Sequence, residues 1–151
     1  NRQLTRDVED TGRFMTLFYL EFNMNDRSLS WVRAGHEPAT LYDPVTDRFE
    51  ELTGKGIALG IDDSWQYAEK RRADLAAGQI ILLSTDGIWE ARNLKDEMFG
   101  RQAIYDIIRQ NSHLPAAKIQ DAILNALHRF QQGVAPADDV TLVIIKISDG
   151  I

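Results

Sequence analysis

The chain has 151 residues, of which 44% are hydrophobic, and its 17 basic and 23 acidic side chains give a formal net charge of −6. With no cysteine, it can hold no disulfide, no Cys-ligated metal and no thiol nucleophile. The acidic balance argues against a general nucleic-acid binder, and no apolar run approaches the roughly 18–20 residues of a membrane span. We therefore expect a cytoplasmic globular domain with no nucleic-acid or membrane partner.

The first residues predict the end of a helix. Leu4 and Val8 lie four apart on one helical face within residues 1–10, and Gly12 follows as a stop signal. The sequence also begins without methionine, so we expect that it was cut from a longer protein.

Extended segments follow Gly12. Residues 13–22 carry apolar side chains at both odd and even positions, which predicts a strand covered on both faces. Residues 28–34 alternate and form a predicted hairpin with the first strand. A second hairpin is predicted from residues 39–42 and 48–52, around a turn that contains Pro44.

Two further strands and two helices complete the pattern. Residues 79–84 and 140–147 are apolar on both faces, which predicts buried strands. Residues 101–110 and 116–131 repeat apolar side chains at offsets of three and four, which predicts helices, and the second begins after Pro115.

The short turns require antiparallel neighbours, whereas the two-sided strands require cover on both faces. Two antiparallel sheets packed on each other, with helices on the outer faces, satisfy both conditions. We therefore predict an α/β fold, a four-layer α-β-β-α sandwich of two mainly antiparallel sheets.

Asp86 and Gly87 directly follow a predicted buried strand. A carboxylate at this point must be solvated, paired or bound to a cation, and Gly87 permits close backbone approach. The alternative is that Asp86 only caps the turn after the strand.

Asp138 and Asp139 open the last predicted strand. Adjacent carboxylates repel each other unless a cation neutralises them, and oxygen ligands suit Mg²⁺ or Mn²⁺. A solvated acidic turn is the alternative. Because both acidic segments adjoin strands apolar on both faces, they could open at the same sheet edge.

His36 lies between the predicted strands 28–34 and 39–42, with Gly35 before it and Pro38 two residues after it. From the residues alone it could be a general acid, a metal ligand or a turn residue held by a backbone hydrogen bond.

The order of the segments RFMTLFYLEFN, SWVRAGHEPATLYD, TDGIWEARN and DDVTLVII resembles the stage II sporulation protein E-type phosphatases. These are a bacterial branch of the metal-dependent type 2C protein serine/threonine phosphatases. The resemblance covers residues 13–147 and implies the same α-β-β-α sandwich.

The resemblance implies a hydrolase in which two Mn²⁺ or Mg²⁺ ions activate a water that attacks a phosphoserine or phosphothreonine of a partner protein. Asp86 and Asp138 match metal-binding, catalytic aspartates of the family, with Asp139 and Gly87 beside them. His36 matches a position near an accessory third metal in related enzymes. The implied partner is a phosphorylated anti-anti-sigma factor, in a full-length chain with an upstream sensor or receiver domain; a homodimer is compatible with this interpretation.

The family's N-terminal aspartate motifs do not occur in this sequence. We therefore expect residues 1–151 to be the C-terminal two-thirds of a phosphatase domain whose N-terminal part is missing, and to be inactive alone. Two other hypotheses remain at this point: a non-catalytic pseudophosphatase module that binds a regulatory partner, and a structural oligomerisation domain in which the aspartates are turn residues.

Overall fold

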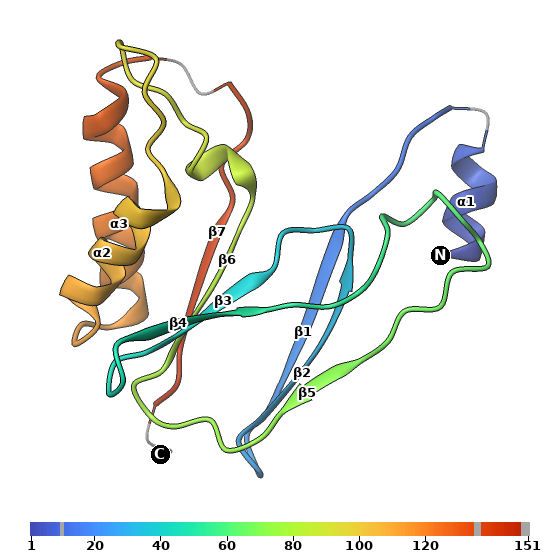
Figure 1. Cartoon of the computed structure of the whole chain (residues 1–151), viewed down its shortest axis with the longest axis horizontal. Helices are drawn as coiled ribbons and strands as arrows, with labels where there is room; N and C mark the ends of the chain where they lie inside the picture. Colours follow the sequence, from blue (N-terminus) through green and yellow to red (C-terminus); the bar gives the residue numbers. More distant parts are fainter. Residues whose placement is uncertain (10, 135–136, 149–151) are drawn as a thin grey trace. The chain divides into compact units, whose positions relative to one another are not determined.

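The computed structural model describes residues 1–9, 11–134 and 137–148, and the chain divides into two units (Figure 1). The first unit comprises Asn1–Pro38 and Leu52–Ala76, and the second comprises Ala39–Glu51 and Ala77–Ile151. The described residues form two antiparallel sheets and three α-helices, so the predicted mixed α/β class is confirmed.

The first unit contains the helix α1 and a three-stranded sheet in the order β1-β2-β5. Its elements are α1 (Arg2–Val8), β1 (Leu17–Asn23), β2 (Ser28–Ala34) and β5 (Lys70–Arg72). The predicted hairpin is confirmed, because β1 and β2 pair antiparallel from Leu17↔Ala34 to Asn23↔Ser28. The predicted helical end is confirmed by α1, although Asp10 lies outside the described residues.

One feature of β1 differs from the expectation. Its burial alternates along the strand, and the face that carries Leu17 and Tyr19 leaves these side chains 42% and 51% exposed. The prediction of cover on both faces is therefore wrong for this face. The physical reason is that α1, the helix of the first unit, has no buried residue and so provides no apolar cover for this face.

The second unit contains a four-stranded sheet in the order β4-β3-β6-β7. Its strands are β3 (Ala39–Asp43), β4 (Arg48–Leu52), β6 (Ile80–Ser84) and β7 (Leu142–Lys146). The central strand β6 pairs antiparallel with β3 through Thr40↔Leu82 and with β7 through Leu82↔Ile144. Of the apolar residues of β6, Ile80, Ile81 and Leu82 are buried and Leu83 is half-buried, as the two-sided pattern predicts. The predicted burial is wrong for β7, which has no buried residue and leaves Val143 46% exposed.

Helix α2 (Arg101–Asn111) ends one residue later than predicted, and helix α3 (Ala116–Gln131) has the predicted bounds. Their apolar faces join the sheet in one buried cluster: Tyr42, Ile80, Leu82, Ile88, Ala91, Ile104, Ile108, Ile119, Ile123 and Leu127. The Lys146 ammonium of β7 also connects this strand to the segment between α2 and α3, because it donates hydrogen bonds to the carbonyl oxygens of Ser112 at 2.7 Å and Leu114 at 2.8 Å.

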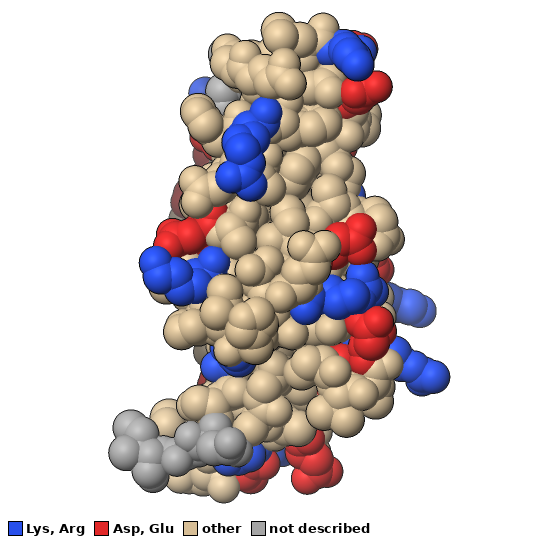
Figure 2. Space-filling model, turned by 90° about the vertical axis from the view of Figure 1, so that its left-hand side faces the viewer, with Lys and Arg blue, Asp and Glu red and all other residues tan. Residues whose placement is uncertain are grey.

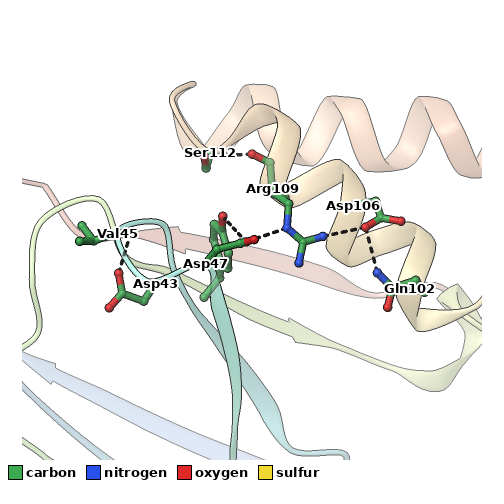
Figure 3. Close-up of polar contacts among 8 residues, drawn as sticks. Asp43, Val45, Asp47, Gln102, Asp106, Arg109 and Ser112 are labelled. Carbon is green, nitrogen blue, oxygen red and sulfur yellow. Dashed lines mark hydrogen bonds and ion pairs between the residues drawn. The ribbon is translucent and has the colours of Figure 1, made fainter.

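A polar network connects the β3–β4 hairpin to α2 within the second unit (Figure 3). Arg109 Nε lies 2.6 Å from Asp47 Oδ1, and the NH1 group of the same guanidinium lies 2.7 Å from Asp106 Oδ1. The Tyr42 hydroxyl also donates a hydrogen bond to Asp47, at 3.2 Å. The bond from the Arg109 guanidinium lowers the pKa of the Asp47 carboxyl, whereas burial raises the pKa of Tyr42.

Figure 2 views the side of the chain on which α2 and α3 lie, and basic and acidic side chains are scattered over it without a patch of one sign. Within the described part of the chain, no helix has the length and apolar character required to cross a bilayer.

Candidate active site

Asp86 begins a short turn at the end of the buried strand β6. The turn is a 3₁₀ helix, Asp86–Ile88, and the Asp86 carbonyl oxygen accepts hydrogen bonds from the amides of Trp89 at 3.1 Å and Glu90 at 3.0 Å. Ile88 is completely buried and anchors the turn in the core, while Asp86 is exposed. The carboxylate is thus held at the surface by a backbone that is fixed on both sides.

Thr85 connects this turn to the segment that leads into β7. Its amide donates to the carbonyl oxygen of Thr141 at 3.1 Å, and its hydroxyl accepts from the Thr141 amide at 3.0 Å. The same hydroxyl donates to the carbonyl oxygen of Asp139 at 3.0 Å. Three hydrogen bonds from one residue therefore determine how the two acidic segments lie beside each other.

Gly87 makes the approach of these segments close. A Cβ atom on Gly87 would lie 2.6 Å from the carbonyl oxygen of Asp139 and 3.2 Å from its carbonyl carbon. No side chain fits there without a backbone shift, so glycine is required for steric reasons. We call Asp86, Gly87, Asp138 and Asp139 together the carboxylate corner.

The three carboxylates of the corner are exposed to solvent. Asp138 Oδ1 accepts a hydrogen bond from the Asp139 amide at 2.7 Å, which restrains that side chain and leaves carboxylate lone pairs for other ligands. The structure thus places the backbone segments that carry four of the five metal-site candidates side by side.

The donor set of the corner fits a hard divalent cation, because Mg²⁺ and Mn²⁺ prefer carboxylate oxygens and water. Asp86 and Asp138 are the residues that would hold it. However, no group of three or more histidine, aspartate or glutamate side chains is positioned to bind a metal anywhere in the described ranges. The corner therefore has the chemistry of part of a metal site, and a complete coordination shell needs ligands in addition to these.

His36, the fifth candidate, belongs to the first unit, whereas the carboxylate corner belongs to the second. It follows Gly35, whose φ of +71° and close packing against Ala58 both favour glycine. The ring nitrogen Nδ1 lies 3.0 Å from the Thr16 hydroxyl, and the His36 carbonyl oxygen accepts from Arg33 Nε. These contacts describe a hydrogen-bonded turn residue, one of the three interpretations that the sequence allowed.

A hollow of about 130 Å³ lies beside the carboxylate corner. Gly87 and Asp138 of the corner line it. The other lining residues are Glu90, Ala91, Arg92, Met98 and Ala137. Arg92 and Met98 were not predicted from the sequence as site residues. Arg92 lies within the TDGIWEARN segment, but nothing in its spacing shows that it reaches the same hollow as Asp138.

Comparison with known proteins gives a family and several relatives. The sequence profile of the family described as Stage II sporulation protein E (SpoIIE) matches residues 1–148. The phosphoserine phosphatase RsbU of Bacillus subtilis is 29% identical over 146 residues, which are 97% of this chain and 42% of RsbU. The chain thus spans less than half the length of this curated relative.

Solved structures show the same fold. The SiaA-PP2C domain of Pseudomonas aeruginosa matches 82% of this chain and 48% of its own, with a TM-score of 0.68 and 24% identity. The phosphatase domain of SpoIIE from Bacillus subtilis, in a form presoaked with Mn, matches 97% of this chain and 61% of its own, with a TM-score of 0.61 and 18% identity. The predicted fold class is confirmed by these likenesses.

Proposed function

We propose, because the chain belongs to the Stage II sporulation protein E (SpoIIE) family, that it forms the C-terminal two-thirds of a metal-dependent protein serine/threonine phosphatase domain. The observation that carries this proposal is the contact between Gly87 and Asp139, which holds Asp86 and Asp138 at one corner of the second unit. The 61% coverage of the SpoIIE phosphatase domain supports the proposed extent.

In the proposed reaction a phosphoserine or phosphothreonine monoester of a partner protein is hydrolysed. Two bound Mn²⁺ or Mg²⁺ ions supply an activated water and charge neutralisation for the phosphoryl group. Asp86 and Asp138 would hold these ions, Gly87 admits the Asp139 backbone, and Thr85 fixes the distance between the two segments. The geometry of the corner within the folded unit, rather than a protein nucleophile, is this chain's proposed contribution.

The substrate and setting are finer parts of the same proposal. The relative RsbU is named a phosphoserine phosphatase, which supports a phosphoserine substrate. The resemblance seen in the sequence adds a phosphorylated anti-anti-sigma factor as partner, an upstream sensor or receiver domain, and a cytoplasmic location. His36 is a candidate for a peripheral role near an accessory metal.

The first test is hydrolysis of p-nitrophenyl phosphate with and without Mn²⁺ by the intact domain. We expect Asp86→Asn to remove nearly all turnover while circular dichroism stays unchanged, because the amide keeps the shape of the side chain and loses its charge. Asp121→Asn, an exposed charge change on α3 away from the corner, serves as the matched control. Unchanged turnover in Asp86→Asn would refute the assignment.

The 151-residue chain alone provides a second measurement. We expect it to bind Mn²⁺ weakly and to be inactive, because no three metal-binding side chains in the described ranges are positioned to hold one ion. Robust Mn²⁺-dependent hydrolysis by this chain would contradict the proposed division of the site.

A second candidate function is a pseudophosphatase module that binds a regulatory partner without chemistry; it differs from the first in whether the intact domain supplies the family's further aspartate motifs. Isothermal titration of the intact domain with Mn²⁺ separates the two functions. Tight binding that is lost in Asp86→Asn supports the phosphatase, and absence of binding supports the pseudophosphatase.

A further inference from the structure

The hollow beside the carboxylate corner, which we call the Arg92 hollow, combines two kinds of lining. Arg92 provides a positive charge, Glu90 and Asp138 provide negative charges, and Ala91 and Met98 provide apolar surface. Met98 is 52% exposed, so its flexible thioether can adapt to a bound side chain. A mixed lining of this kind suits a polypeptide better than a small apolar molecule.

The wall that carries Arg92 and Met98 is a tightly hydrogen-bonded turn. Arg92 and Met98 face each other in an antiparallel bridge. Between them, Asn93 Oδ1 accepts from the amides of Lys95 at 2.9 Å and Glu97 at 3.0 Å, and Asn93 Nδ2 donates to Glu97 at 2.7 Å. A turn fixed in this way presents its side chains in one arrangement before any ligand binds.

The Arg92 guanidinium is anchored through one of its nitrogens. Its NH1 group donates to the Asp96 carbonyl oxygen at 2.7 Å and lies 3.2 Å from the Asp96 carboxylate, while the side chain is 42% exposed. Among the contacts of the described residues, Nε and NH2 make no hydrogen bond, so planar donors remain for a ligand. Such donors match the oxygens of a phosphate or a carboxylate.

We propose that the Arg92 hollow is a substrate-binding subsite and that Arg92 binds an oxyanion of the phosphoprotein substrate in it. The oxyanion is either the phosphoryl group or a carboxylate next to the phosphoserine. This inference rests on the proposed phosphatase function. Its physical basis is that Arg92 and Asp138 line one hollow, so a phosphoserine at the carboxylate corner places its own or its neighbours' oxygens within that hollow.

The test measures kcat and KM for the full-length protein with Mn²⁺ on three substrates: p-nitrophenyl phosphate, a phosphoserine peptide flanked by glutamates and the same peptide flanked by alanines. Loss of a charge-assisted hydrogen bond in Arg92→Ala should raise KM by about tenfold or more and change kcat less. An increase for all three substrates identifies the phosphoryl group. An increase only for the acidic peptide identifies the flanking carboxylate.

Lys95→Ala is the matched control, because Lys95 is an exposed cation on the same turn and does not line the hollow. Arg92→Lys is the second variant; it keeps a charge and a donor for Asp96, and we expect an intermediate KM even if Arg92→Ala fails to fold. Unchanged KM in the folded Arg92 variants, or an equal increase in Lys95→Ala, would overturn the proposal.

A binding measurement separates this inference from the proposed function. The anisotropy of a fluorescein-labelled phosphoserine peptide is titrated with the Asp86→Asn protein, with and without Arg92→Ala. We expect the second substitution to weaken binding by about tenfold. Absent turnover in the unaltered protein would remove the phosphatase proposal, whereas equal binding in the two variants would remove the role of Arg92.

Discussion

The two sheets of the chain differ in how their faces are covered. In the second unit, Ile80 and Ile81 of β6 are completely buried, and apolar residues of α2 and α3 pack in the same cluster as Ile80. In the first unit, β1 leaves Leu17 and Tyr19 about half exposed on one face. The carboxylate corner belongs to the well-covered sheet, which indicates that positioning of the acidic side chains depends on the packing of the second unit.

Removal of buried volume from the second unit should have the largest effect. Ile123 of α3 is completely buried in the cluster that supports β6 and the Asp86 turn. We expect Ile123→Ala to lower the free energy of unfolding by about 2–5 kcal/mol, measured by urea denaturation, because a cavity adds to the lost burial. Leu124→Ala, the adjacent residue at 40% exposure, should cost less than about 1 kcal/mol. Equal losses would contradict the comparison.

A methyl group at the corner should have an intermediate effect. Gly87→Ala places a Cβ atom against the Asp139 carbonyl oxygen, and the two segments must separate. We expect a loss of about 1–3 kcal/mol in urea denaturation, together with weaker Mn²⁺ binding in titration calorimetry. Gly54→Ala in the first unit is the control, because a Cβ atom there would lie no nearer than 3.2 Å to its neighbours, against 2.6 Å at Gly87. Wild-type Mn²⁺ binding in Gly87→Ala would show that the contact does not position the carboxylates.

The smallest predicted effect is a pH dependence that arises from Asp47. The hydrogen bond from Arg109 lowers its pKa in the folded protein, so the unfolded chain binds more protons in that pH range. Stability from this group is present above the unfolded pKa and is lost as the pH falls through the folded pKa. We therefore expect the thermal midpoint to fall less steeply between about pH 5 and pH 2 in Asp47→Asn than in the unaltered protein.

Asp121→Asn on α3 is the control for the loss of one carboxylate charge, because its partner Lys118 lies within one exposed helical turn. If Asp47→Asn and Asp121→Asn show the same pH profile, the Arg109 contact does not stabilise the second unit in acid.

Local patterns predicted the secondary structure closely. The strand β2 and the helix α3 occur at their predicted bounds, since the period of their apolar residues reports which face is buried. The face of β1 that carries Leu17 and Tyr19 was wrongly predicted to be covered. Apolar side chains show that a face can be buried, but they do not show which other element covers it.

The candidate site was predictable residue by residue but not as an arrangement. Asp86 and Asp138 were identifiable as carboxylates next to buried strands. The close approach of Gly87 to the Asp139 backbone, where an added Cβ atom would lie 2.6 Å from the carbonyl oxygen, joins positions about 50 residues apart in the chain, and it depends on the pairing of β6 with β7. Arg92 was missed for the same reason, because its neighbour Asp138 is distant in sequence.

The amino-acid sequence by itself determined the helices, the strands and the types of donor atom available, because these follow from short-range periodicity and side-chain chemistry. Tertiary structure alone decided which donors meet. Leu82 pairs with Ile144 in adjacent strands, and Thr85 hydrogen-bonds Asp139 and Thr141 across that register. Such contacts follow from strand pairing and core packing, which no local pattern contains.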